Sequence, residues 1–84
     1  MLQIKFTPHG QKDLIALPKD IQNRIVEKLE FYSAQPVPLT FAKPLYRLPP
    51  STHRFRIGPY RVAFFIHLKT LFVERVAHRR EVYM

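Results

Sequence analysis

The strongest hydrophobic pattern in the chain recurs every three or four residues between positions 17 and 32. This spacing places apolar side chains on one face of a helix and leaves polar residues on the others. The residues on the apolar face are Leu17, Ile21, Ile25, Leu29 and Tyr32. Proline is tolerated in the first turn of a helix but not in its interior. The pattern therefore predicts an amphipathic helix that begins close to Pro18.

A short strand and a short helix are expected before this amphipathic helix. Residues 1–6 alternate loosely between polar and apolar side chains, as a strand does. Thr7 suits a helix N-cap with Pro8 at the first helical position, and we expect that helix to run through Gln11 to Leu17. Two helices joined this closely should form an αα-hairpin.

Residues 33–51 are rich in proline, and the prolines are Pro36, Pro38, Pro44, Pro49 and Pro50. Proline lacks an N–H donor, which excludes a helix here and disfavours a central strand. We expect an ordered connection that lies against the rest of the domain.

The last third of the chain is predicted to be β-structure. Three runs, His53–Ile57, Tyr60–His67 and Leu71–Ala77, are rich in Phe, Val, Ile and Tyr and are separated by short breaks. The predicted order is β-α-α-β-β-β, in one domain over residues 1–84. This order favours the α+β class, with an antiparallel, twisted sheet, the αα-hairpin on one face and the other face free.

A two-residue loop fixes the register of the predicted hairpin. Gly58-Pro59 is a credible loop of this kind, with glycine at the position that needs a positive φ. Arg56 then lies opposite Arg61, and Arg54 shares their face because side chains two apart on a strand point the same way. The opposite face would be apolar and buried against the helices, formed by Phe55, Ile57, Tyr60, Val62, Phe64 and Ile66.

The charge distribution also indicates that this arginine face binds anions. Lys and Arg number 14 against 6 Asp and Glu, which gives a formal net charge of +8. The stretch between Glu30 and Glu74 contains no acidic residue, although it contains Lys43, Arg47, Arg54, Arg56, Arg61 and Lys69. Uncompensated positive charge attracts polyanions, and like charges opposed in a sheet destabilise it until an anion binds. The planar fork of arginine suits phosphate, and the alternative is a simple solvated face.

Other residue types restrict the remaining possibilities. The chain has no cysteine, and its histidines have no ligand spacing supported by carboxylates, so we expect neither a metal site nor a cofactor. The N-terminus is too polar for a signal peptide and no apolar run is long enough to span a membrane, so we expect a cytoplasmic protein. Histidine is the residue type best suited to proton transfer near neutrality, which makes His78 a candidate for that role. Tyr83 offers a phenol, or is an ordinary packing aromatic.

Residues 54–64 and 72–83 together resemble the RelE branch of the RelE/ParE toxin superfamily. The shared features are a basic-x-basic strand, a turn, Tyr60-Arg61, a hydrophobic hairpin and a closing His-Arg-x-x-Val-Tyr at residues 78–83. The resemblance implies the toxin of a type II toxin–antitoxin system that enters the ribosomal A site and cuts messenger RNA without a metal. The partners it implies are a cognate antitoxin, in a hetero-oligomer, and the ribosome with its mRNA. The 2′-hydroxyl attacks the adjacent phosphate in this chemistry.

The same resemblance implies roles for single residues. Arg56 belongs to a basic pair that serves RNA contact and proton transfer, and Arg61 stabilises the pentavalent phosphorane. Arg79 acts as, or supports, the general acid for the 5′-oxygen, and Tyr83 activates the 2′-hydroxyl or stacks on a base. His78 stands where relatives carry lysine or histidine. The predicted RNA contacts are Arg54, Arg47, Lys43 and Arg80. Two alternatives stay open: a ParE-like toxin that inhibits DNA gyrase, and a nucleic-acid-binding module without catalysis.

Overall fold

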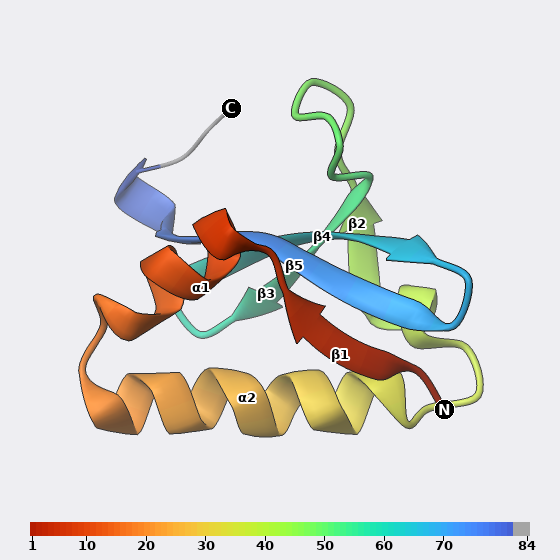
Figure 1. Cartoon of the computed structure of the whole chain (residues 1–84), viewed down its shortest axis with the longest axis horizontal. Helices are drawn as coiled ribbons and strands as arrows, with labels where there is room; N and C mark the ends of the chain where they lie inside the picture. The colour runs from red at the N-terminus through yellow and green to blue at the C-terminus, as the bar shows by residue number, and fades with distance from the viewer. Residues whose placement is uncertain (82–84) are drawn as a thin grey trace.

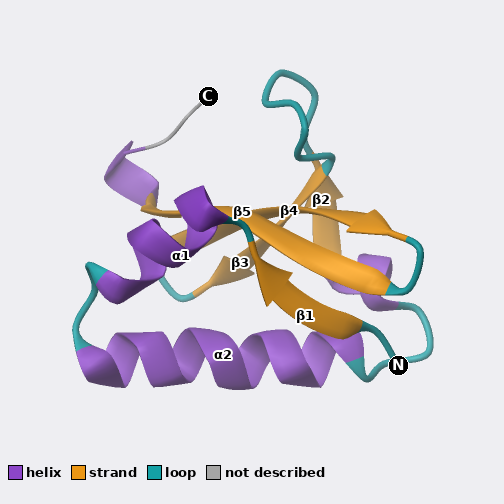
Figure 2. Cartoon of the chain, viewed as in Figure 1, coloured by secondary structure: helices purple, strands orange, loops and turns teal. Residues whose placement is uncertain are grey.

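The computed structural model describes residues 1–81, and residues 82–84 lie outside the described part (Figure 1). One strand and two helices come first in the chain, and most of the later elements are strands (Figure 2). In chain order they are β1 (Gln3–Phe6), α1 (Pro8–Ile15), α2 (Lys19–Ser33), the 3₁₀ helix η1 (Pro38–Phe41), β2 (Ala42–Pro44), β3 (His53–Ile57), β4 (Tyr60–His67), β5 (Thr70–His78) and the 3₁₀ helix η2 (Arg79–Glu81).

The strands form one five-stranded sheet in the order β1-β5-β4-β3-β2. This arrangement confirms the predicted α+β class, and the three hairpin strands agree with their predicted bounds to within one residue. Two details differ from the expectation. The sheet is mixed, because β1 pairs with β5 in parallel, and the proline-rich connection contains the short strand β2 and, where a helix was excluded, the 3₁₀ helix η1, which has Pro38 in its first turn. β2 lies at the edge of the sheet, where a proline costs no ladder hydrogen bond.

Both helices begin as their sequences predict. Thr7 caps α1, with its Oγ1 accepting a hydrogen bond from the Gly10 N–H at 3.1 Å, and Pro8 occupies the first turn. Pro18 is the N-cap of α2. α1 ends at Ile15, two residues before the predicted end at Leu17, because the residue before a proline is disfavoured in the helical region.

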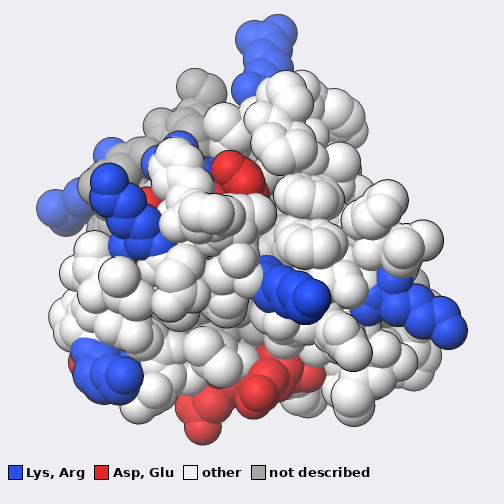
Figure 3. All heavy atoms as spheres, in the orientation of Figure 1, with Lys and Arg blue, Asp and Glu red and all other residues white. Residues whose placement is uncertain are grey.

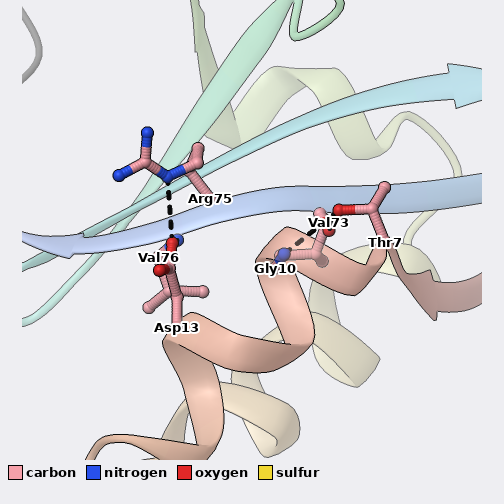
Figure 4. A network of polar contacts seen from close by, with 6 residues as sticks. All are labelled: Thr7, Gly10, Asp13, Val73, Arg75 and Val76. Carbon is pink, nitrogen blue, oxygen red and sulfur yellow. Dashed lines mark hydrogen bonds and ion pairs between the residues drawn. The ribbon is translucent and has the colours of Figure 1, made fainter.

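α1 continues along the edge of β5 where β1 stops (Figure 4). The Thr7 N–H and hydroxyl both donate to the carbonyl oxygen of Val73, at 3.0 and 3.2 Å. Gly10 then passes so close that a Cβ there would strike this carbonyl oxygen and lie 2.9 Å from its carbonyl carbon. The close approach therefore requires glycine at position 10.

One carboxylate completes the contact between α1 and β5. Asp13 Oδ2 accepts hydrogen bonds from the Val76 N–H and from Arg75 Nε, both at 3.0 Å (Figure 4). The Val76 N–H belongs to the part of β5 that extends beyond its pairing with β1. A buried edge N–H needs an acceptor, so Asp13 replaces the missing strand at this point.

The core lies between the helices and one face of the sheet. α2 runs along this face in Figure 1 and contributes Ile25 and Leu29, both fully buried. Leu14 of α1 joins the same cluster. The predicted apolar face of the hairpin is confirmed: Phe55, Ile57, Val62 and Phe64 are buried, and Tyr60 and Ile66 pack partly against them. The helices thus cover one sheet face, and the arginines lie on the other.

Candidate functional site

The hairpin register brings the arginines together as predicted. Gly58 has φ +57°, and Arg56 pairs directly with Arg61 across the two-residue loop. Arg54 lies two residues before Arg56, and on its other side it pairs with Lys43 of β2. Because paired residues share a face, four cations from three adjacent strands point to the same side. They line a pocket of about 240 Å³ whose residues are Phe41, Lys43, Arg54, Arg56 and Arg61.

The pocket is strongly cationic. Arg56 and Lys43 are exposed, Arg54 and Arg61 are half-buried, and one terminal guanidinium nitrogen of Arg61 is buried. Among the described residues, no acidic side chain lines this pocket. Partial burial raises the energetic importance of each charge, because protein surroundings screen charges less than water does. A bound anion would relieve the repulsion, and arginine can offer it two parallel hydrogen bonds.

The acidic side chains gather elsewhere on the molecule. Figure 3 looks at the side that carries α1, α2 and β1, and its acidic atoms are most numerous at the bottom, over α2. The exposed acids of α2 are Asp20, Glu27 and Glu30. On α2 these carboxylates are mixed with Lys19, Arg24 and Lys28, whereas in the described part of the chain the pocket on the opposite sheet face is lined by cations with no carboxylate.

Three of the predicted site arginines lie outside the pocket. Arg47 is exposed in the loop between β2 and β3, which projects from the body of the molecule (Figure 1). Arg79 and Arg80 are exposed on η2. The Arg79 N–H donates to the Pro59 carbonyl oxygen at 2.7 Å, and this bond fixes the start of η2 against the β3–β4 loop. Tyr83, the predicted base or stacking residue, lies outside the described residues.

His78 occupies a different place from the one its predicted role suggests. It ends β5 and pairs with Tyr60, and the two rings meet edge to face with centroids 5.4 Å apart. Its Nδ1 accepts a hydrogen bond from the Arg80 N–H at 3.2 Å. Paired residues share a face, so His78 lies on the Tyr60 side of the sheet, whereas Arg61 projects to the other. The structure does not bring His78 into the arginine pocket.

Sequence comparison places this geometry in a known group. Residues 4–83 match the family described as ParE toxin of type II toxin–antitoxin system, parDE. The chain belongs to the RelE/ParE toxin superfamily. No curated protein matches the toxin's sequence. Among the described residues, no helix is long and apolar enough to cross a membrane.

Solved toxin–antitoxin complexes share the toxin's fold. One chain of the RelBE2 toxin–antitoxin complex from Mycobacterium tuberculosis is 34% identical in sequence to this toxin. The match has a TM-score of 0.75 and covers 93% of the toxin and 98% of the solved chain. The RelB–RelE complex from Methanococcus jannaschii is 26% identical, with a TM-score of 0.64 over 99% and 95%. A ParDE system from P. aeruginosa, 20% identical with a TM-score of 0.68 over 93% and 96%, shows the same fold. Because RelE and ParE toxins share this fold, only the chemistry of the site can distinguish the two types.

One pocket residue was missing from the predicted site. Phe41 is the last residue of η1, and it lines the pocket beside the four cations. The sequence carried a weak signal for it, since Phe41 stands two residues before Lys43, which was predicted to contact RNA. The signal was hidden because the strand that pairs Lys43 with Arg54 lies in the proline-rich connection, which was not expected to be β-structure.

Proposed function

We propose that the toxin is a ribosome-dependent endoribonuclease and that its pocket arginines hold the phosphate at which messenger RNA is cut. The observation that carries this proposal is the direct pairing of Arg56 with Arg61 in a pocket that also contains Arg54 and Lys43. Four cations around a small volume are a costly arrangement without an anion. The 34% identity to the toxin–antitoxin complex RelBE2 supports the RelE branch.

The proposed reaction uses the RNA's own nucleophile. The 2′-oxygen attacks the adjacent phosphorus, the bond from phosphorus to the 5′-oxygen breaks, and the products are a 2′,3′-cyclic phosphate and a 5′-hydroxyl. Negative charge grows on the non-bridging oxygens as the phosphorane forms. Arg61 is held partly buried beside Arg56, so its guanidinium is positioned before the charge develops, which is the arrangement that stabilises a transition state most.

Two protons also have to move, one from the 2′-hydroxyl and one to the 5′-oxygen. Arg79 and Tyr83 keep the proton-transfer roles that the family resemblance suggests. His78 is better suited to positioning. In the neutral ring Nδ1 accepts the Arg80 N–H, which favours the tautomer with its proton on Nε2, so Nδ1 could take up a proton only by giving up this hydrogen bond. In the charged ring an Nδ1–H would face the Arg80 N–H.

We therefore expect His78→Asn to keep the mRNA cleavage rate within about tenfold of the parent, while His78→Ala loses more. The asparagine oxygen can accept the Arg80 N–H where Nδ1 does now. A group that transferred a proton would contribute about 10²–10⁴-fold, and asparagine could not replace it. The measurement is the cleavage rate of both variants on translating ribosomes at several pH values. Equal, large losses in both variants would show that His78 transfers a proton.

A second candidate function is ParE-like inhibition of DNA gyrase without RNA cleavage. Two observations favour it: the matching family is described as ParE toxin, and a ParDE toxin shares the fold. A third possibility keeps the phosphate pocket but has no catalysis. The partner proposed in every case is an antitoxin in a hetero-oligomer, because the RelBE2 and RelB–RelE structures are antitoxin–toxin complexes. Messenger cleavage would add ribosome and mRNA as partners, in the cytoplasm.

Primer extension on translating ribosomes separates these functions. We expect new 5′-ends within A-site codons when the purified toxin is added, and far fewer in the same time with the double variant Arg56→Gln/Arg61→Gln. Arg24→Gln is the matched control, because it removes an exposed arginine from α2 and leaves the pocket intact. A parallel supercoiling assay tests gyrase. Intact messenger RNA together with inhibited supercoiling would favour gyrase inhibition over RNA cleavage. Binding of RNA on the ribosome without new 5′-ends would support the non-catalytic alternative.

A further inference from the structure

Phe41 is an aromatic side chain at an otherwise cationic pocket. Phe41 is 45% exposed, although it stacks on Tyr32, which packs against the core. The remaining lining of the pocket is Lys43 and the three arginines. An exposed phenylalanine costs solvation free energy, so its position beside four cationic side chains suggests that a ligand of the pocket covers it.

The ring of Phe41 is held from behind by the hydrophobic core. It stacks on Tyr32 of α2, with centroids 5.1 Å apart and planes at 25°. Tyr32 stacks in turn on Phe55 at 4.6 Å, and Phe55 on Phe64 at 4.4 Å. We call Phe41, Tyr32, Phe55 and Phe64 the aromatic column. Because its inner rings are fully or partly buried, the column fixes the orientation of the one ring that reaches the pocket.

We infer that Phe41 provides a stacking surface for a nucleobase of the RNA whose phosphate is held by the pocket arginines. The inference rests on the proposed function, since it needs RNA in this pocket. Single-stranded RNA is recognised by aromatic rings on which unstacked bases lie, next to cations that follow the backbone. The pocket combines one such ring with four such cations.

The size of the pocket supports one nucleotide at a time. Its volume of about 240 Å³ is below the range of about 300–1,000 Å³ that is typical of sites enclosing a whole small ligand. It can therefore take part of a polymer, a phosphate with the adjoining base, while the rest of the strand lies outside. Stacking tolerates every base because every base has a π face, so Phe41 would strengthen binding without reading a particular sequence.

The best alternative to a nucleobase as the group that covers Phe41 is a protein partner. Phe31 of α2 lies edge to face with Phe41 at 6.2 Å, and other exposed apolar side chains nearby in sequence are Val37 and Leu39. Such a patch could contact an antitoxin. Nucleobase stacking is favoured because Phe41 lines the cationic pocket, whereas none of the other three does.

The test compares two RNA probes on the purified toxin. One is a trinucleotide with a 2′-O-methyl group that blocks attack, and the other is the same trinucleotide lacking the base at that nucleotide. Binding is measured by NMR titration. We expect the wild-type chain to bind the complete trinucleotide at least about fivefold more tightly than the abasic one. Phe41→Leu should remove this preference, and Phe41→Trp should keep it, whereas Arg56→Gln should weaken binding of both probes equally.

The outcomes separate the stacking surface from the phosphate site. A base preference that survives in Phe41→Leu, with both probes still weakened by Arg56→Gln, would overturn the inference and leave the proposed function standing. Failure of the wild-type toxin to bind either probe would overturn the inference, whereas the proposed function is decided by primer extension on translating ribosomes. If Phe41→Leu weakened only the binding of a cognate antitoxin, Phe41 would be a protein contact and the inference would be wrong. Thermal unfolding of each variant shows that any loss is local, and Phe41→Trp keeps the result interpretable if leucine disturbs the aromatic column.

Discussion

Replacing Arg61 with glutamine is expected to slow cleavage of messenger RNA by about 10²–10³-fold. Glutamine can still donate a hydrogen bond, so the loss measures the positive charge directed at the phosphorane. Arg61 is the more enclosed member of its pair with Arg56, which is exposed. Enclosure reduces screening by water, so we expect the Arg56→Gln loss to be smaller than that of Arg61→Gln.

The double variant provides the sharper measurement. If Arg56 and Arg61 hold the same phosphate, the loss in the double variant should be smaller than the product of the two single losses, because the first substitution already disturbs the shared contact. Single-turnover cleavage on translating ribosomes gives the three rates, with Arg24→Gln on α2 as the control for charge alone. Strictly multiplicative losses would place the two arginines on different phosphates.

Gly10→Ala is expected to lower the free energy of unfolding by about 3 kcal/mol. The direction is opposite to the usual one, since alanine inside a helix normally stabilises it by about 0.5–1 kcal/mol relative to glycine. A Cβ at position 10 would strike the Val73 carbonyl oxygen, which is backbone and has little room to move. Relieving that contact would lift α1 from β5 and weaken the hydrogen bonds that Thr7 and Asp13 make there.

Urea unfolding of the purified toxin measures this loss. Gln11→Ala is the matched control, because Gln11 is the exposed neighbour of Gly10 on α1 and its replacement should leave stability nearly unchanged. An unchanged or increased free energy of unfolding in Gly10→Ala would contradict the close approach of α1 to β5. Cleavage by the folded fraction should stay normal, since Gly10 is not a lining residue of the pocket.

Local sequence signals predicted the centre of the site correctly. The loop Gly58-Pro59 permits only one short register, and that register alone places Arg56 opposite Arg61, as the sheet does. The alternation of apolar and basic residues in β3 then assigns each face. These features can be predicted because they depend on neighbours in the sequence and on a single tight turn.

Features that depend on distant pairings could not be predicted in this way. The parallel pairing of β1 with β5 joins residues at opposite ends of the chain, and no local pattern gives its direction. Phe41 enters the pocket only because β2 forms, and the prolines around β2 concealed it. His78 was assigned by its chemistry and by the family resemblance, whereas its orientation follows from the Tyr60 pairing at the end of β5.

The edge strands of the sheet affect how the toxin behaves in concentrated solution. The two outermost strands are β1, with four residues, and β2, with three residues. Each carries an exposed lysine, Lys5 or Lys43, and β2 ends in Pro44, which cannot donate to a further strand. Short, charged and proline-bearing edges are the means by which β-proteins resist edge-to-edge aggregation. On β5, beyond its pairing with β1, Asp13 accepts the hydrogen bond of the Val76 N–H, so this edge donor cannot pair with another chain. A second copy would therefore find little backbone to pair with, and toxin molecules should stay dispersed.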